Sequence, residues 1–477
     1  MNPDYPTIIP RPDHTISRKW ISPNAVRVLY RLKEGGYQAY LVGGGVRDLL
    51  LGREPKDFDI ATDATPGEVK KLFRNCRLIG RRFRLAHVYY HNEIIEVATF
   101  RSQAVLDSGE AEVTQAPGPQ AAAPAAEGGP AVAVPPRPRP PRMLKTEDGM
   151  ILRDNVFGAP GEDAVRRDFT VNALFYNIAD FSVIDYVGGV DDLRRGLIRI
   201  IGDPEVRFTE DPVRIIRAVR FAAMLGFAIE ENTYRAMLAL RNRVALASNA
   251  RLYEETLKLF LLGEGEKTYQ LLRKTGLFGV LFPRLNEWVD TEAEGFPHTR
   301  IGKALEWVDA CVQAGRQPVT HVLFALVIGQ YLEEGAAELQ RTGTSSHDAI
   351  EQAVAGFLGE QAPRVLIPRK VGLGIRDILL NQHRFEKTEG KRPLSFLKRQ
   401  GFEDAFEYFR FTSEATGEKR ELRAWWKDFI KSHPRALEGK GEKQAAKPPP
   451  PAPAARRKRR RRRAGPAKRN PGTGPKN

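Results

Sequence analysis

A glycine turn followed by two nearby aspartates constrains this chain more than any other feature. The turn, Leu-Val-Gly-Gly-Gly-Val-Arg-Asp, spans residues 41–48, and Asp57-Phe58-Asp59 begins nine residues after it. Glycines let backbone N–H groups approach a phosphate closely. Two carboxylates two residues apart on a strand point to the same face, so both can bind a divalent metal ion. The two motifs together predict a site for a nucleoside triphosphate and Mg2+, suited to phosphoryl chemistry.

The first part of the chain reads as a small mixed sheet covered by helices, an α/β arrangement. Strands are expected at residues 38–42, 57–61, 85–90 and 93–99, and helices at 25–32 and 46–51. Thr65 is expected to cap a helix that begins at Pro66, with Glu68 closing a capping box. From residue 204 onward the strand signals stop. Helical periods then follow at residues 212–225, 251–263, 266–274, 301–314, 319–332, 347–358 and 395–411, and end near residue 432.

Two segments lack the composition of a packed structure. Residues 104–142 hold nine prolines among many alanines and glycines, and we expect a disordered insertion there. Residues 436–477 carry 14 Lys/Arg against two Glu, which is most of the net charge of +16. Such a disordered basic tail suits a polyanion, most simply RNA.

Composition narrows the class of protein further. No run of about 18 apolar residues is present, so no membrane span is expected. The first residues lack the basic and apolar regions of a secretory signal. The two cysteines, Cys76 and Cys311, build neither a disulfide framework nor a cysteine-based zinc site. We expect a cytoplasmic protein.

A second constellation, Arg-Arg-Asp-Phe-Thr-Val-Asn-Ala, lies at residues 166–173. In a functional interpretation its arginines, Arg167 among them, hold phosphates. Asp168 and Asn172 then face the sugar of a nucleotide or a metal ion. In the plainer alternative Asp168 caps a helix that begins near Thr170, or pairs with Arg167.

A third constellation begins at Glu210 and Asp211 and continues with Arg214, Arg217 and Arg220. Arginines at every third position form a stripe along one side of a helix. The plainer alternative is a solvated face with a local Asp–Arg pair. Because Val213, Ile216 and Val219 alternate with the arginines, the stripe is expected beside a buried face, where guanidinium groups can grip phosphate or a base edge.

Glu96 is a candidate third metal ligand. It lies among apolar neighbours on the strand expected at residues 93–99. Two-metal sites take two or three convergent carboxylates. The alternative is a solvated side chain that faces outward.

The motifs in this order resemble the class II nucleotidyltransferase family, which contains CCA-adding tRNA nucleotidyltransferases and bacterial poly(A) polymerases. The resemblance covers roughly residues 23–290. It implies a nucleotidyltransferase head at residues 23–200, a helical neck at 201–290, a helical RNA-binding domain at 291–435 and the basic tail at 436–477. It also implies that Asp57 and Asp59 bind the catalytic metals, with either Glu96 or Asp168 as the third catalytic carboxylate.

The resemblance implies nucleotide contacts as well. Gly43, Gly44 and Arg47 are expected at the triphosphate, and Asp211 and Arg214 at the base. Further nucleotide contacts are expected from Arg167, Arg217 and Arg220, and the motif at 166–173 adds Asn172 to them.

Two activities remain open within this family. Residues 80–88 and 363–411, and the arginine-rich tail, resemble the bacterial poly(A) polymerase version. This version predicts template-independent addition of AMP from ATP to RNA 3′ ends, with Mg2+ and release of pyrophosphate. The alternatives are a CCA-adding or A-adding tRNA nucleotidyltransferase, a catalytically inactive RNA-binding protein, and a small-molecule nucleotidyltransferase.

Overall fold

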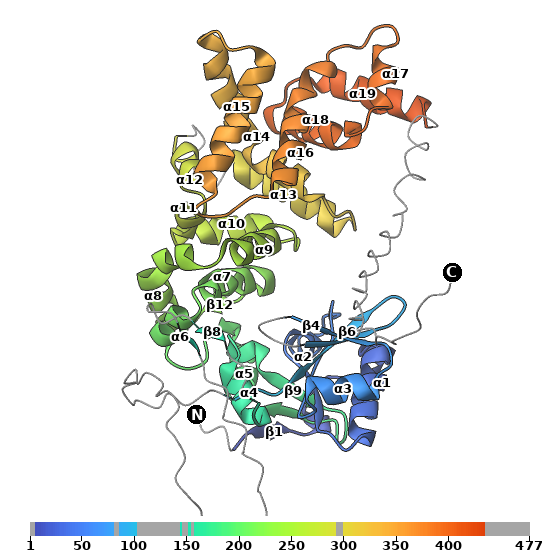
Figure 1. Cartoon of the computed structure of the whole chain (residues 1–477), viewed down its shortest axis with the longest axis vertical. Coiled ribbons are helices and arrows are strands. Elements are labelled where there is room, and N and C mark those ends of the chain that lie inside the picture. The colour runs from blue at the N-terminus through green and yellow to red at the C-terminus, as the bar shows by residue number, and fades with distance from the viewer. Residues whose placement is uncertain are drawn as a thin grey trace, which may run out of the picture.

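The computed structural model describes residues 5–80, 85–102, 144–145, 151–153, 157–291 and 299–434. The expected insertion at 104–142, the tail at 436–477 and part of the stretch at 80–88 lie outside these residues. Figure 1 shows a sheet-containing head and a long arm of helices that curves away from it. No helix among the described residues is long and apolar enough to cross a bilayer.

The head is built on one eight-stranded mixed sheet, in the order β1-β10-β9-β2-β3-β6-β5-β4. Only β3 and β6 run parallel to each other, and the other neighbours are antiparallel. The strands are β1 (Thr7–Ile9), β2 (Ala39–Val42), β3 (Asp59–Thr62), β4 (Cys76–Ile79), β5 (Leu85–Tyr89), β6 (Ile94–Thr99), β9 (Leu174–Asn177) and β10 (Val183–Asp185).

The two faces of this sheet differ in their covering. Alternate residues such as Leu41, Ile60 and Val97 join the main core, against which α1 (Pro23–Glu34) and α3 (Pro66–Leu72) pack. Part of the other face carries a smaller cluster around Val42 and Phe175. The helices α2 (Gly44–Leu50), α4 (Pro160–Arg166) and α5 (Gly189–Arg195) complete the head.

Several local expectations for the head are confirmed. The expected hairpin is the antiparallel pair β5 and β6. Thr65 and Glu68 form the capping box, because the Thr65 hydroxyl accepts from the Glu68 N–H and the Glu68 carboxylate accepts from the Thr65 N–H. Two expectations for the head need correction. The expected strand at 57–61 begins later, at Asp59, so Asp57 precedes it. The sheet also begins before residue 23, because β1 pairs with β10.

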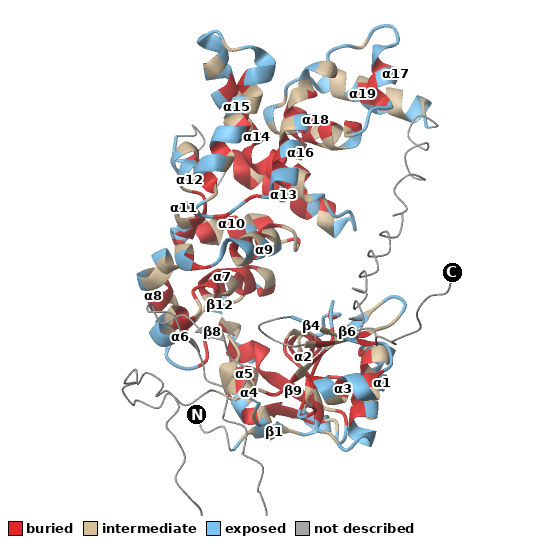
Figure 2. Cartoon of the chain, in the orientation of Figure 1, coloured by how far each residue is buried: buried red, intermediate tan, exposed pale blue. Residues whose placement is uncertain are grey.

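Helices make up most of the described chain after the head. They are α6 (Pro204–Glu210), α7 (Val213–Leu225), α8 (Glu231–Leu240), α9 (Asn249–Phe260), α10 (Gly265–Lys274), α11 (Leu277–Leu281), α12 (Pro283–Val289), α13 (Arg300–Gln313), α14 (Thr320–Arg341), α15 (Ser346–Gln361), α16 (Arg369–Leu380), α17 (Arg392–Leu397), α18 (Phe402–Thr416) and α19 (Arg420–Ser432). Figure 2 shows buried residues along the arm. They belong to more than one core, since Phe385, Phe396, Phe402 and Trp426 near its end form a cluster apart from the main one.

Three expectations for this part need correction. The helix expected at 395–411 is two helices, since α17 ends at Leu397 and Gly401, with φ +81°, stands directly before α18. The helix expected at 319–332 continues to Arg341. Strands do not stop at residue 204, since β12 (Ala228–Ile229) pairs with β11 (Leu197–Ile198).

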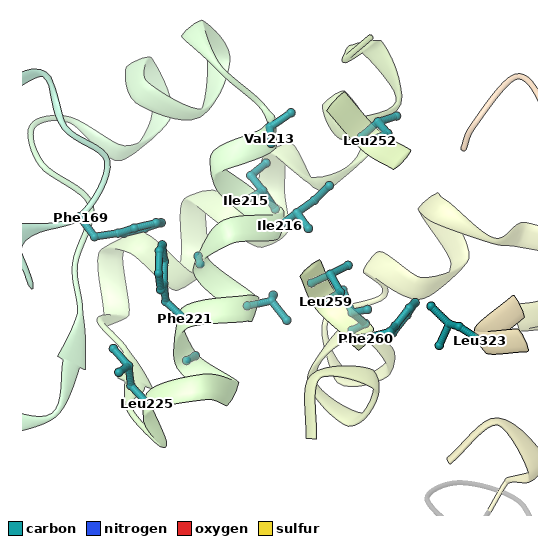
Figure 3. Packing of buried hydrophobic residues seen from close by; sticks show 14 of the residues in the cluster. Phe169, Val213, Ile215, Ile216, Phe221, Leu225, Leu252, Leu259, Phe260 and Leu323 are labelled. Carbon is teal, nitrogen blue, oxygen red and sulfur yellow. The ribbon is translucent and has the colours of Figure 1, made fainter. Parts of the chain in front are cut away.

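Helix α7 joins the head to the arm. Its Phe221 lies edge-on against Phe169 of the head, with ring centroids 5.7 Å apart. Figure 3 shows these two rings turned toward each other, while Ile216 points toward Leu259 and Phe260 of α9. The apolar side of α7 is therefore buried between two parts of the molecule, which fixes the direction of its arginine stripe.

Candidate active site

A cavity of about 920 Å³ lies where the head meets α7 and α9. It is lined by all the predicted site residues except Glu96: Gly43, Gly44, Arg47, Asp57, Asp59, Arg167, Asp168, Asn172, Asp211, Arg214, Arg217 and Arg220. Glu96 lines a neighbouring cavity of about 810 Å³, which shares Lys56, Asp57 and Asp59 with the first. Residues far apart in the sequence thus converge on one site.

The glycine turn stands at the end of β2. Gly43 has φ +72° and ψ −138°, a conformation open mainly to glycine. A Cβ atom on Gly43 would lie 3.2 Å from the Nη1 atom of Arg167. Helix α2 begins at Gly44, immediately after the turn. The turn therefore brings bare backbone against a guanidinium group at the wall of the cavity.

The carboxylates of Asp59 and Glu96 belong to adjacent parallel strands. The two residues are direct partners in the register of β3 and β6, so their side chains share a face of the sheet. The protein around Asp59 removes part of its hydration, and Glu96 and Asp57 add negative charge. Together these effects raise the pKa of Asp59 to about 6, against the opposing influence of Arg167.

The Glu96 side chain is partly exposed and lies beside His87. Its side chain is 47% exposed, and its Oε1 atom lies 3.3 Å from Nε2 of His87. Its position beside Asp59 follows from the strand register and not from the apolar residues that flank it in sequence.

Arg47 is buried, and its guanidinium group is held by protein atoms. It donates to the Asp48 carboxylate at 2.9 Å and to the Asn172 side-chain oxygen at 2.6 Å. Arg167 in turn donates to Asp163 at 3.0 Å. These contacts order the wall behind the glycine turn.

Asp168 forms an ion pair with Arg217 of α7. One carboxylate oxygen accepts from Arg217 at 2.8 and 2.5 Å, and the other from the Phe169 N–H and the Asn172 amide. Burial alone would raise the pKa of Asp168, but these contacts lower it to about 2. Both plainer alternatives for Asp168 are wrong, since the short helix at Thr170–Asn172 has no side-chain cap and Arg167 pairs with Asp163 instead.

The arginine stripe of α7 is confirmed. Around the ring of Phe221, the guanidinium carbons of Arg47, Arg217 and Arg220 lie 5.4, 5.3 and 4.4 Å from the centroid. Arg214 donates to the Arg207 carbonyl at 2.8 Å and lies 3.5 Å from Glu210. These cations therefore sit side by side along the cavity, partly neutralised by acids of the protein.

Sequence reasoning missed the contribution of α9. Arg251 donates to both carboxylate oxygens of Asp211, at 2.9 and 2.8 Å. Glu255 lies 3.7 Å from Arg217 and 3.3 Å from Arg220, and it also pairs with Lys258. Burial would raise the pKa of Asp211, but the contacts with Arg251 lower it. The positions 251, 255 and 258 follow a helical spacing, which was the available signal for this charged face.

Carboxylate oxygens are the ligands that Mg2+ prefers, so the donor set of Asp57, Asp59 and Glu96 fits that ion. A cation there would also offset the repulsion that raises the pKa of Asp59. Among the described residues, three ligand atoms lie within 4.8 Å of one another only at His347, Asp348 and Glu351 on α15. Asp57, Asp59 and Glu96, which all line the 810 Å³ cavity, are therefore more widely spaced than this.

Three family models match parts of this chain. The family model described as the poly A polymerase head domain matches residues 39–199. The model of a probable RNA and SrmB-binding site of polymerase A matches 226–289, and that of the polymerase A arginine-rich C-terminus matches 342–464.

Curated relatives and solved structures extend the likeness. Poly(A) polymerase I of Salmonella typhi is 42% identical, over 91% of this chain and 88% of that protein. The CCA-adding enzyme of Lactobacillus gasseri is 34% identical, over 56% of this chain and 61% of that protein. The crystal structure of the Bacillus stearothermophilus CCA-adding enzyme in complex with CTP has a TM-score of 0.55 and 25% identity, and the match covers 87% of this chain and 83% of that one.

Proposed function

This chain belongs to the bacterial poly(A) polymerase I family, and we infer from this that it is a nucleotidyltransferase that adds AMP from ATP to RNA 3′ ends. The observation that carries the inference is 42% identity over 91% of the chain. The CCA-adding relative matches 56% of it. The polymerase relative thus matches more of the chain than the CCA-adding relative does, and the model of the polymerase A arginine-rich C-terminus matches residues 342–464.

We propose that Asp57, Asp59 and Glu96 hold Mg2+ at the edge of β3 and β6. When bound there, Mg2+ would neutralise triphosphate charge and activate the RNA 3′-hydroxyl. Glu96 is the better third carboxylate, because it stands opposite Asp59. Asp168 is already occupied by Arg217, Asn172 and the Phe169 N–H, so it serves as a positioning residue for Arg217.

The triphosphate is assigned to the glycine turn and the α7 stripe. Gly43 and Gly44 leave room for a phosphate to approach the backbone. Arg217 and Arg220 supply charge beside it, and Glu255 sets their direction. Arg47, Arg167 and Asn172 form the wall that supports the turn.

The base of the incoming nucleotide is assigned to Asp211 and Arg214, which line the same cavity. Other partners hold both side chains: Arg251 donates to the Asp211 carboxylate, and Arg214 donates to the Arg207 carbonyl and lies beside Glu210. These contacts fix the orientation of both side chains at the cavity wall, which suits hydrogen bonding to one edge of a base.

The basic tail at 436–477 is proposed to tether RNA through phosphate contacts. Each neutralised phosphate on a single strand contributes about −0.7 to the slope of log binding constant against log salt. Deleting the tail should flatten the salt dependence of RNA binding and leave ATP binding unchanged. An unchanged slope would assign the RNA contacts to the folded domains alone.

One comparison tests the function against its alternatives. The purified protein is incubated with each labelled ribonucleoside triphosphate and either a generic RNA or a tRNA that lacks its 3′ end. Extension of both RNAs with AMP alone supports polyadenylation. Efficient addition of C, C and A to the tRNA would instead assign the CCA-adding activity, and no transfer at all would favour an inactive RNA-binding protein.

A further inference from the structure

A row of polar residues crosses four neighbouring strands of the head sheet. Asp59 of β3 pairs with Glu96 of β6, Glu96 pairs with His87 of β5, and His87 pairs with Arg77 of β4. Residues paired in register project their side chains from the same face of a sheet. The row therefore extends the two carboxylates outward with an imidazole and then a guanidinium group.

The same face carries side chains that suit nucleic acid. The Tyr89 ring lies 6.3 Å from the His87 ring, and the Arg77 guanidinium carbon lies 5.4 Å above the Tyr89 ring. Two large apolar side chains are exposed there, Ile79 at 43% and Ile94 at 48%.

The opposite face of these strands behaves differently. Its residues Ala86, Val88, Ile95 and Val97 are almost fully buried in the main core. The strands are thus packed on one side, and on the other they present polar, aromatic and apolar groups to solvent.

This open face is hollowed beside the carboxylates. The 810 Å³ cavity is lined by His87, Tyr89 and Glu96 among others, and it shares Lys56, Asp57 and Asp59 with the larger cavity. The two cavities thus meet at the proposed metal ligands, one on the side of the glycine turn and one on the side of β5 and β6.

Phosphoryl transfer places the attacking and leaving oxygens roughly in line. The leaving pyrophosphate belongs to the glycine-turn side, where the triphosphate is assigned. The attacking 3′-hydroxyl must then arrive from the other side of Asp57 and Asp59, where the second cavity lies. Sheet faces with aromatic and cationic side chains bind single-stranded RNA by stacking and phosphate contacts.

We propose that the open sheet face of β6, β5 and β4 binds the 3′-terminal nucleotides of the acceptor RNA, with Tyr89 stacking on a base and Arg77 contacting the backbone. This assignment rests on the proposed function, since it names where the second substrate of that reaction lies. It gives the hairpin of β5 and β6 a role in RNA binding in addition to carrying Glu96 of the proposed metal site.

The test uses the full chain with Mg2+, ATP and a short oligoadenylate as acceptor. Tyr89→Ala and Arg77→Ala are compared with Arg74→Ala, an exposed arginine just before β4. Loss of one stacked base should raise the KM for the oligonucleotide roughly tenfold. Arg77→Ala should also lower the salt slope of oligonucleotide binding by about 0.7. The KM for ATP should stay unchanged in both variants, and Arg74→Ala should match the wild type.

Each other outcome has a distinct meaning. An unchanged oligonucleotide KM in both variants, with an active wild type, overturns the acceptor assignment. A parallel rise in the KM for ATP overturns it too, because the residues would then serve the nucleotide site or the fold. A wild-type protein that extends no RNA at all contradicts the proposed function itself.

Discussion

Arg251 of α9 holds both carboxylate oxygens of Asp211, which lies 40 residues earlier in the chain. Such a two-pronged contact fixes direction as well as distance. Since Asp211 directly precedes Pro212 and α7, the pair ties the start of the arginine helix to α9. The side chain assigned to the base of the nucleotide is therefore aimed by a residue that no local motif contains.

Removing this partner should disturb nucleotide selection. Arg251→Ala is expected to raise the KM for ATP and to lower the ratio of kcat/KM for ATP to that for CTP. Each change should be roughly ten- to a hundredfold, because hydrogen bonds to charged groups are worth about 1.5–3 kcal/mol. Steady-state kinetics with each nucleotide measures both effects. Arg235→Ala, which removes an exposed pair with Glu231 on α8, is the matched control. Equal preference ratios in the two variants would contradict the role given to Arg251.

The carboxylates should be essential for transfer and dispensable for folding. Asp57→Ala and Asp59→Ala each remove a proposed metal ligand at the surface of the cavity, so AMP incorporation should fall by roughly 100- to 1,000-fold. Circular dichroism and thermal melting should report an intact fold. Asp191→Ala, at an exposed acid on α5, should retain full activity. If Asp57→Ala and Asp59→Ala both retained more than about a tenth of the activity, neither aspartate could be an essential metal ligand.

The raised pKa of Asp59 predicts a pH-dependent effect on stability. Its pKa of about 6 in the folded protein exceeds the ordinary value of 3.8, so the folded state binds the proton more tightly. Proton binding by Asp59 therefore adds to the free energy of unfolding. This stabilising contribution is fully present below pH 3.8 and is lost as the pH rises through 6.

Asp59→Asn removes that titration. Its melting temperature at pH 8, without divalent metal, should exceed that of the wild type, and the difference should shrink at pH 5. Added Mg2+ should stabilise the wild type more than the variant. A variant less stable than the wild type at pH 8 would show that the Asp59 charge is already compensated.

Gly43 should resist substitution because of its backbone. An alanine would be strained at φ +72°, at a cost of about 1–3 kcal/mol, and its Cβ would press on Arg167. Gly43→Ala should therefore lower kcat/KM for ATP and the melting temperature together. Gly67→Ala, within α3 with no atom near the new Cβ, should keep both or gain slightly in stability. Wild-type kinetics in Gly43→Ala would rule out a close backbone approach by the triphosphate.

Most of the elements of the head could be predicted because their signals are local. The capping box of Thr65 and Glu68, the hairpin of β5 and β6 and the stripe on α7 each depend on residues within one helix or two consecutive strands. The wrong predictions concern elements whose presence or ends depend on a contact distant in sequence or on one backbone angle. Strand β1 is too short to recognise without β10, and Gly401 divides a helical period that looks continuous.

The same distinction between local signals and distant contacts holds for the candidate site. The sequence by itself determined which side chains are candidates for the chemistry, because the glycine turn, the paired aspartates and the arginine spacing are set by neighbours in the chain. Only the tertiary structure decided which of them meet: Glu96 with Asp59 through the β3–β6 register, Arg217 with Asp168, and Arg251 with Asp211. Strand order and helix packing bring together residues tens of positions apart, and no periodicity along the chain encodes such pairings.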